Sequence, residues 1–284
     1  MARKLQMAAV ATVVLAVLFG ACGEVLAQSA GDEEQIQIEG STTVGPIAKA
    51  FAEAFMSEHE NVNVTVKLTG SGDGAAALID GRCHVAAMSR FMKPGEFAKA
   101  VENGVLPVAH TVAMDGVCPV VHPSNPVGEL TTQELKDIYL GNITNWKQLG
   151  GVDQRIVAIS RDTSSGTFGV FSKLVMNDEK MTGGVEYVTS NQNMHQRIAS
   201  TRGAIGYVGV GFLDRNVKAV KLDGVAPDRR TLATGQFPLV RPLFMWTDGY
   251  PKIGSTLHQF VSFYLTETGQ DIIEAKGFVP LTKY

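Results

Sequence analysis

The sequence predicts an α/β protein in which short strands alternate with helices and lie parallel in a sheet. Two observations lead to this fold class: apolar residues alternate over short runs such as 62–68, and helix-like runs with apolar residues every three or four positions follow them. Serine and threonine also follow three successive strands before residue 100. Because parallel strands place ligands beyond their carboxyl ends, these hydroxyl groups predict one shared binding site.

The first strand-loop-helix unit occupies the stretch "IQIEGSTTVGPIAKAFAEAF". Apolar residues alternate at 36–38, Gly40 ends the strand, and apolar residues recur at helical spacing over 47–55. The loop between strand and helix carries three hydroxyl side chains, those of Ser41, Thr42 and Thr43. A helix N-terminus offers N–H groups without partners and a partial positive charge, so we expect this loop to favour an anion.

Two further units repeat this arrangement. The strand at 62–68 leads to Ser71, which is placed to cap a helix that runs to Gly81. A short buried strand then ends at Ser89 and Arg90, ahead of a helix that starts at a proline. We expect the three hydroxyl-bearing loops to converge, because hydroxyls and helix ends together can bind an anion without net positive charge.

A fourth polar loop, "SRDTSSGTFGVF", follows the predicted strand "RIVAIS". Arg161 offers a planar guanidinium that can bind an anion with two N–H groups, and Gly166 lets the backbone approach a ligand closely. The remaining donors in this loop are the hydroxyls of Ser164, Ser165 and Thr167. The composition of the loop predicts an anion cradle.

The same loop could also be a nucleophile loop, a P-loop or a serine-capped helix. A nucleophile loop would need G-x-S-x-G around Ser164 or Ser165, and a P-loop would need G-x-x-x-x-G-K-[ST]; the sequence has neither. A serine-capped helix beside a surface arginine explains the loop alone equally well. The three earlier hydroxyl-rich strand ends favour the cradle.

Two Asp-Gly dipeptides, Asp115–Gly116 and Asp248–Gly249, suggest a discontinuous domain layout. We expect residues 28–114 plus 249–284 to form one lobe and residues 115–248 to form the other. Ordinary turns contain Asp-Gly as often, so a hinge role for these dipeptides is a hypothesis.

The composition excludes several classes of partner. The 284 residues carry a formal net charge of −3 and no Lys/Arg-rich run, so we expect no nucleic-acid partner. The six histidines show no zinc-type spacing, and we expect no metal and no cofactor. Since net charge would not attract an anion, local dipoles and one or two arginines must bind it.

The N-terminus predicts export. A positively charged "RK" precedes an apolar stretch at 7–19 that is short for a membrane span, and "VLA" ends at Ala27 with small residues at the cleavage positions. We therefore expect residues 1–27 to be a signal peptide and the mature protein to be periplasmic. Lipidation at Cys22, where "LFGAC" loosely resembles a lipoprotein box, and an uncleaved anchor are the alternatives.

Export also changes the interpretation of the cysteines. Cys83 and Cys118 would remain as a pair in an oxidising compartment, so a disulfide between them is possible. The alternative is two buried thiols.

The chain resembles the phosphate-binding proteins that serve the phosphate ABC importer, within the type II periplasmic binding-protein superfamily. The stretches that carry the resemblance run in order through nearly the whole mature chain: "GSTTVGPIAKAFAEAF", "LTGSGDGAAALIDG", "VAAMSR", "LTTQELKDIYLGNITNWKQLGG", "SRDTSSGTFGVF", "GAIGYVGVG" and "GQDIIEAKGFVPL". Each piece alone is a weak signal, and their combination is specific.

The resemblance implies two α/β lobes joined by two crossover segments, with the ligand cleft between them. It implies a monomeric solute-binding protein, not an enzyme, that captures inorganic phosphate and delivers it to an ABC permease in the inner membrane. The resemblance assigns phosphate binding to Thr42, Thr43, Ser71, Ser89, Arg161, Ser165, Gly166 and Thr167. Ser41 and Arg90 lie beside these residues in the sequence and are included as candidates.

The sequence departs from the family pattern at two positions. Some members have an aspartate where this chain has Arg90, and that aspartate accepts the proton of hydrogen phosphate. Another aspartate often lies where this chain has Thr163. A carboxylate acceptor favours protonated phosphate over sulfate, so these departures bear on selectivity; Asp73 or Asp162 could supply the acceptor instead.

Three alternative functions follow from the same residues. The protein could bind another tetrahedral oxyanion, namely sulfate, molybdate or tungstate. It could be a secreted phosphatase-like hydrolase that uses Ser164 or Ser165, or a sensory or adhesive module on the same fold.

Overall fold

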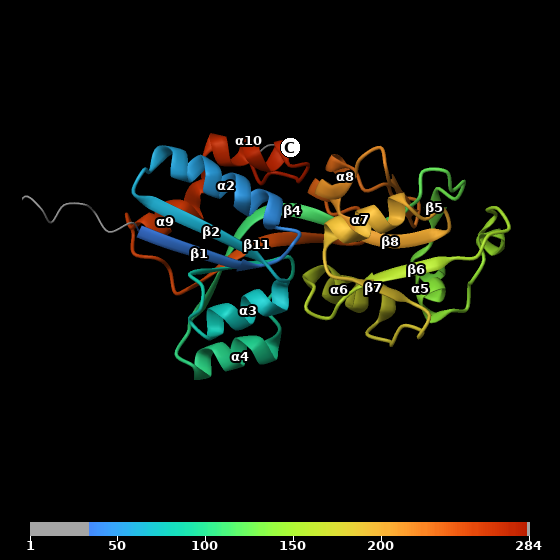
Figure 1. The fold of residues 1–284 in the computed structure, drawn as a ribbon, viewed down its shortest axis with the longest axis horizontal. Coiled ribbons are helices and arrows are strands. Elements are labelled where there is room, and N and C mark those ends of the chain that lie inside the picture. The colour runs from blue at the N-terminus through green and yellow to red at the C-terminus, as the bar shows by residue number, and fades with distance from the viewer. Residues whose placement is uncertain (1–33, 283–284) are drawn as a thin grey trace, which may run out of the picture.

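The computed structural model describes residues 34–282, so the predicted signal peptide and Cys22 lie outside the described residues. A first group of elements forms one lobe, which Figure 1 shows on the left. Its strands lie between α2 and α10 on one side and α3 and α4 on the other. The elements up to residue 102 are β1 (Glu34–Gly40), α2 (Gly45–Glu58), β2 (Val62–Leu68), α3 (Ser71–Ile79), β3 (Val85–Met88) and α4 (Pro94–Glu102).

The second lobe repeats the alternation of strands and helices. Its elements are β5 (Glu129–Leu130), α5 (Thr132–Leu140), β6 (Val157–Arg161), α6 (Gly166–Phe171), β7 (Glu186–Val188), α7 (Asn191–Ala199), β8 (Ala204–Gly209), β9 (Lys218–Ala219), β10 (Lys221–Leu222) and α8 (Arg229–Ala233). A π-helical stretch at Ser172–Met176 continues α6, and 3-10 turns lie at Trp146–Leu149, Val210–Phe212 and Phe263–Leu265. The chain returns to the first lobe through α9 (Thr256–Ser262) and α10 (Glu267–Ala275).

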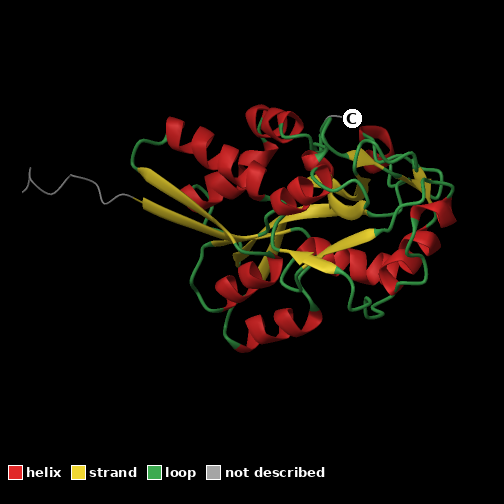
Figure 2. Ribbon diagram, turned by 45° about the vertical axis from the view of Figure 1, so that its right-hand side comes forward, coloured by secondary structure: helices red, strands yellow, loops and turns green. Residues whose placement is uncertain are grey.

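Two further strands, β4 (Pro107–Val121) and β11 (Val240–Asp248), complete the sheet. One continuous sheet runs through both lobes in the order β2-β1-β3-β11-β4-β8-β6-β7, with β9 paired to β4. The strand β1 pairs in parallel with β2 and β3, and β6 pairs in parallel with β7 and β8. The predicted α/β class is therefore confirmed, with helices flanking the strands as in Figure 2. Among residues 34–282, no helix combines the length and apolar character that crossing a membrane requires.

Two long antiparallel strands connect the lobes: β4 (Pro107–Val121) and β11 (Val240–Asp248). Both run between the two groups of elements in Figure 1. The strand β4 pairs with β11 as far as Gly116 and with β8 from Val117 onward. The dipeptide Asp115–Gly116 therefore lies inside a strand, at the point where its partner changes.

The second predicted boundary differs from the structure. Leu239 packs in the core of the second lobe, whereas Leu243 and Met245 pack in the core of the first. The dipeptide Asp248–Gly249 instead makes a local turn at the end of β11, where the Gly249 amide donates to the carbonyl of Leu106. We propose that the second lobe ends near Val240, and that the first lobe includes the rest of β11.

Each lobe has its own apolar core. In the first lobe, Phe55 of α2 meets Phe260 and Phe263 edge to face. In the second lobe, Phe171 stacks on Tyr207 with ring centroids 4.0 Å apart. The hydroxyl of Tyr207 accepts a hydrogen bond from the Arg161 amide at 3.2 Å, so this core also fixes the end of β6.

The possible disulfide between Cys83 and Cys118 is not present, because both thiols are free and buried. Cys83 packs in the apolar cluster under α3 and α4 of the first lobe, whereas Cys118 lies on the part of β4 that pairs with β8. Burial raises the pKa of Cys83 to about 11 and that of Cys118 well above its usual value. Both side chains therefore behave as buried apolar groups with little thiolate character.

Candidate functional site

The polar loops of both lobes meet at the boundary between them. In the first lobe they are residues 41–43 after β1, Ser71 at the start of α3, and Ser89 after β3. In the second lobe the loop from Arg161 to Thr167 follows β6 and leads into α6. Each loop lies at the carboxyl end of a strand, as expected for a parallel α/β site.

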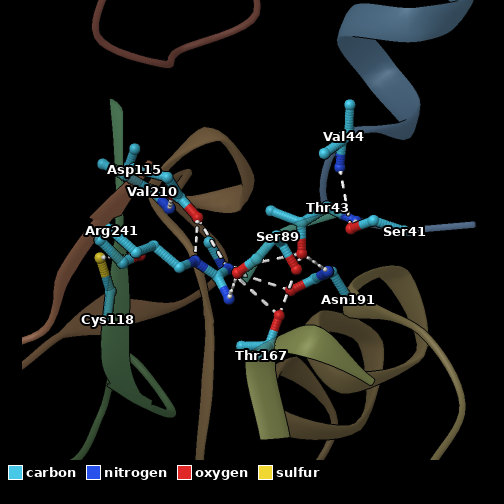
Figure 3. Close-up of polar contacts among 12 residues, drawn as sticks. Ser41, Thr43, Val44, Ser89, Asp115, Cys118, Thr167, Asn191, Val210 and Arg241 are labelled. Atoms are coloured by element: carbon cyan, nitrogen blue, oxygen red, sulfur yellow. Dashed lines mark hydrogen bonds and ion pairs between the residues drawn. The ribbon is translucent and has the colours of Figure 1, made fainter. Parts of the chain in front are cut away.

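Hydroxyl groups of the two lobes contact each other directly. The Oγ1 atoms of Thr43 and Thr167 lie 3.0 Å apart, and both side chains are buried. Asn191, the first residue of α7, donates from Nδ2 to Thr43 Oγ1 at 2.8 Å. Figure 3 shows these three side chains converging from the turn before α2, from α6 and from α7.

Ser71 and Ser89 form a second pair of hydroxyls beside the first. Their Oγ atoms are 3.3 Å apart, and Ser71 Oγ also accepts from the Ser89 amide at 3.0 Å. Gly166 of the opposite lobe packs against this pair. A Cβ atom there would lie 2.3 Å from Ser71 Oγ and 2.5 Å from Ser89 Oγ, so the lobes can meet this closely only because residue 166 is glycine.

Two predicted site residues shape their loops through side-chain caps. The Oγ atom of Ser41 accepts from the amides of Thr43 and Val44, which fixes the turn into α2 (Figure 3). Ser165 is the N-cap of α6 and accepts from the Phe168 amide at 3.2 Å. Their hydroxyl oxygens are therefore engaged with the backbone of their own loops.

Arg161, the last residue of β6, is a buried cation at this boundary, and only 1% of it is exposed. Its Nε atom donates to the Val188 carbonyl, and Nη2 donates to the Thr189 carbonyl at 2.9 Å and to Thr42 Oγ1 at 3.3 Å. The Nη1 atom is buried and has no hydrogen-bond partner among the described residues. Burial lowers the pKa of Arg161 to about 10 from its ordinary value of 12.5. A buried guanidinium with an unused donor is suited to an anion, because an unpaired buried charge is costly.

Arg90, another predicted site residue, is paired within its own lobe. Its guanidinium forms two hydrogen bonds, of 2.8 and 2.7 Å, with the carboxylate of Glu96 in the first turn of α4. Such a fork-to-fork pair uses the charge of Arg90 locally. We infer that Arg90 organises the loop before α4 and does not contact a ligand held by Arg161.

The two aspartates considered as proton acceptors are also placed elsewhere. Asp73 lies on α3 and is exposed. Asp162 Oδ1 accepts from the amide of Ser164 at 3.0 Å and from its hydroxyl at 2.6 Å, which stabilises the loop. Among the described residues, neither carboxylate hydrogen-bonds to Thr43, Thr167, Ser71 or Ser89.

The sequence analysis missed three buried residues of this boundary: Asp115, Asn191 and Arg241. Asp115 was considered only as part of a lobe boundary, and Arg241 was not considered as a site residue. They form an ion pair of 2.7 Å between β4 and β11, and Figure 3 shows it beside Thr43 and Thr167. Burial raises the pKa of Asp115, and Arg241 acts against that increase.

The backbones of the lobes also touch. The amide of Gly72 in α3 donates to the Ser164 carbonyl at 2.9 Å, and the hydroxyl of Ser164 approaches the Thr69 carbonyl at 3.4 Å. Together with the contacts between Thr43 and Thr167, these bonds define a closed arrangement of the lobes. Within residues 34–282, no cluster of three or more His, Cys, Asp or Glu is arranged to bind a metal.

Two α/β lobes linked by two strands, with polar loops facing each other across the boundary, define the class of type II periplasmic binding proteins. The chain belongs to the PBP superfamily, since the family model described as the PBP superfamily domain matches residues 27–268. This match spans both lobes, so the family assignment covers the whole site.

Relatives and solved structures narrow the comparison. The phosphate-binding protein PstS of Bacillus subtilis is 34% identical over 251 residues, which are 87% of this chain and 81% of the relative. A putative phosphate ABC transporter substrate-binding protein from Clostridium perfringens, solved with bound phosphate, has a TM-score of 0.80 and 32% sequence identity to this chain. The match covers 87% of this chain and 99% of the Clostridium chain. An ABC-type phosphate transport receptor from Vibrio cholerae has a TM-score of 0.71 and 31% identity, with coverages of 86% and 99%.

Proposed function

We propose that the protein captures inorganic phosphate between its two lobes and delivers it to an ABC importer. The observation that carries this proposal is Arg161, a buried guanidinium whose Nη1 has no partner among the described residues and whose Nη2 donates to the hydroxyl of Thr42 in the opposite lobe. The names of the similar proteins from Bacillus subtilis and Clostridium perfringens support phosphate as the anion.

The binding mechanism follows from the two half-sites. When the lobes separate, Arg161 and Thr167 remain on one lobe, and Thr43, Ser71 and Ser89 remain on the other. A tetrahedral anion that bonds to both sets stabilises the closed form and shifts the population toward it. Charge-assisted bonds from Arg161 and neutral bonds from hydroxyls then act in a site shielded from water, where each is stronger.

The arrangement supports binding better than catalysis. Ser165 Oγ caps α6, and Ser164 Oγ donates to Asp162. Neither serine hydrogen-bonds to a histidine among residues 34–282, whereas a nucleophilic serine needs a general base within reach. The similar proteins are named as binding components of transporters, which also supports a non-enzymatic role.

Export, periplasmic location, a monomeric state and a membrane permease as partner belong to the same proposal. They rest on the "RK"-plus-apolar N-terminal pattern and on the transporter named for the similar structures. A phosphate-loaded closed form would be the species that the permease receives.

Titration calorimetry of the mature chain, residues 28–284, tests the ligand. We expect phosphate to bind at one site per chain and sulfate to bind at least about tenfold more weakly, a difference of about 1.4 kcal/mol. Molybdate and tungstate serve as further competitors. Tight sulfate binding without phosphate binding would contradict the proposal, as would turnover of a chromogenic phosphoester that is lost in Ser165→Ala.

A further inference from the structure

Arg241 lies where the chain passes between the lobes. On β11 it is directly opposite Asp115 of β4 in the antiparallel register, so the two side chains are cross-strand partners. The Nε atom donates to Asp115 Oδ2 at 2.8 Å, and Nη2 lies 2.7 Å from the same oxygen. Asp115 Oδ1 accepts from the Val210 amide at 2.8 Å, which anchors the pair to the end of β8.

From this anchored position the guanidinium reaches both lobes. Its Nη1 donates to the Ser89 carbonyl of the first lobe at 3.1 Å. Its Nη2 donates to Thr167 Oγ1 of the second lobe at 3.1 Å and approaches Thr43 Oγ1 of the first lobe at 3.5 Å. A single buried side chain therefore ties three polar loops together at the boundary where the lobes close.

These contacts also determine which hydroxyls can donate. A threonine hydroxyl has one proton and two acceptor sites. Thr43 Oγ1 receives an N–H group from Asn191, and Thr167 Oγ1 receives one from Arg241 Nη2, which also lies 3.5 Å from Thr43 Oγ1. If the Thr43 proton goes to Thr167, both acceptor sites of Thr167 Oγ1 are filled, and the Thr167 proton must go to a further acceptor. The Thr167 hydroxyl is then free to donate a hydrogen bond to an anion oxygen.

The second hydroxyl pair differs in this respect. Ser71 Oγ accepts from the Ser89 amide and shares one hydrogen bond with Ser89 Oγ. Two acceptor sites on this pair remain after those bonds. Hence the Thr43–Thr167 pair suits a deprotonated oxygen of the ligand, while Ser71 and Ser89 can also receive a proton.

We propose that Arg241, held by Asp115, is a positioning residue of the anion site: it fastens the closed form and turns the hydroxyl protons of Thr43 and Thr167 toward the anion. This inference rests on the proposed function, because it concerns the same ligand. Arg241 acts through the threonines, whereas Arg161 offers its own free donor to the ligand.

The test measures how fast phosphate leaves the site. Mature protein loaded with radiolabelled phosphate is chased with unlabelled phosphate, and the bound fraction is followed by rapid filtration. We expect Arg241→Met to raise the dissociation rate at least about tenfold, as for loss of a buried hydrogen-bonded charge, and to change the association rate much less. Arg197→Met is the matched control, because Arg197 forms an exposed ion pair with Glu186 on the second lobe. Phosphate should leave this control variant at the wild-type rate.

A double-mutant cycle separates positioning from general stability. Because Arg241 acts through Thr167, Thr167→Val should weaken binding clearly in the wild type and much less in Arg241→Met. A dissociation rate is independent of the fraction of molecules that fold, so a purely structural role would leave it unchanged. If Arg241→Met does not fold, Arg241→Lys can be tested instead, because lysine keeps the charge but lacks the planar guanidinium. Phosphate should still leave this variant faster than the wild type.

The outcomes distinguish the two claims. The role of Arg241 would be overturned if phosphate left Arg241→Met or Arg241→Lys at the wild-type rate. It would also be overturned if the affinity losses of Arg241→Met and Thr167→Val simply multiplied in the double mutant. Phosphate binding by the wild type would stand in both cases. Absence of phosphate binding by the wild type would contradict the proposed function and this inference with it.

Discussion

Replacing Arg161 with methionine is expected to abolish tight phosphate binding without weakening the fold. Removing one partner of a buried charged contact commonly costs ~2–5 kcal/mol, which corresponds to a loss of affinity of roughly 30-fold or more. Methionine retains much of the side-chain volume and leaves no charge to bury. Titration calorimetry of Arg161→Met against phosphate measures the loss directly.

Without ligand, the same variant should be at least as stable as the wild type. Burial lowers the pKa of Arg161 to about 10, so holding its protonated form in the ligand-free native state costs stability at neutral pH. We expect Arg161→Met without ligand to melt no lower than the wild type, and phosphate to raise its melting temperature no further. A variant that melts well below the wild type, or that keeps the phosphate-induced shift, would contradict this role.

Gly166→Ala is expected to prevent full closure of the lobes. The added methyl group would lie 2.3 Å from Ser71 Oγ and 2.5 Å from Ser89 Oγ of the opposite lobe, and both hydroxyls are buried. Overpacking of this kind costs ~1–3 kcal/mol, so affinity should fall by about fivefold or more. Small-angle scattering should also show that added phosphate contracts the wild type more than the variant.

Gly95→Ala provides the matched control, since Gly95 also lies in the first turn of a helix but has open space where its Cβ would be. We expect it to bind phosphate like the wild type and to be slightly more stable, because alanine favours helix over glycine by up to ~1 kcal/mol. Equal affinities of Gly166→Ala and the wild type would show that the lobes do not approach this closely in the bound form.

The local parts of the fold could be predicted because each is encoded by a short pattern. Alternation at 36–38 and helical spacing at 47–55 correspond to β1 and α2. The helix α3 begins at Ser71, but its N-cap is Gly70 and not Ser71, which the sequence predicted. The hydroxyl-bearing loops could be located because they follow these strands. The side chains of Thr43 and Thr167 then meet as a consequence of parallel strand order, which the repeated units implied.

The missed features depend on contacts between residues distant in sequence. Arg90 was placed in the site by its neighbour Ser89, but Glu96, on the following helix, pairs with it. Nothing local marks Arg241, because its role arises only when β11 lies beside β4 and brings Asp115 opposite. The choice between a disulfide and two buried thiols depended on the same kind of contact: the topology puts Cys83 and Cys118 in different lobes, and both thiols are free and buried.

The second lobe boundary shows how a local signal can mislead. Asp248–Gly249 has the composition of a break, and it does form a turn, with Gly249 at φ 64°. The chain nevertheless changes cores earlier, near Val240, within an unbroken strand. A strand that crosses between lobes without a turn residue leaves no compositional mark in the sequence.

A crystal structure of the mature protein grown with phosphate is the most direct test of the central claim. We predict one phosphate between the lobes, with one oxygen within hydrogen-bond distance of Arg161 Nη1 and others facing hydroxyl groups from both lobes. A phosphate bound to one lobe only, or an Arg161 guanidinium turned away from the ligand, would contradict the account.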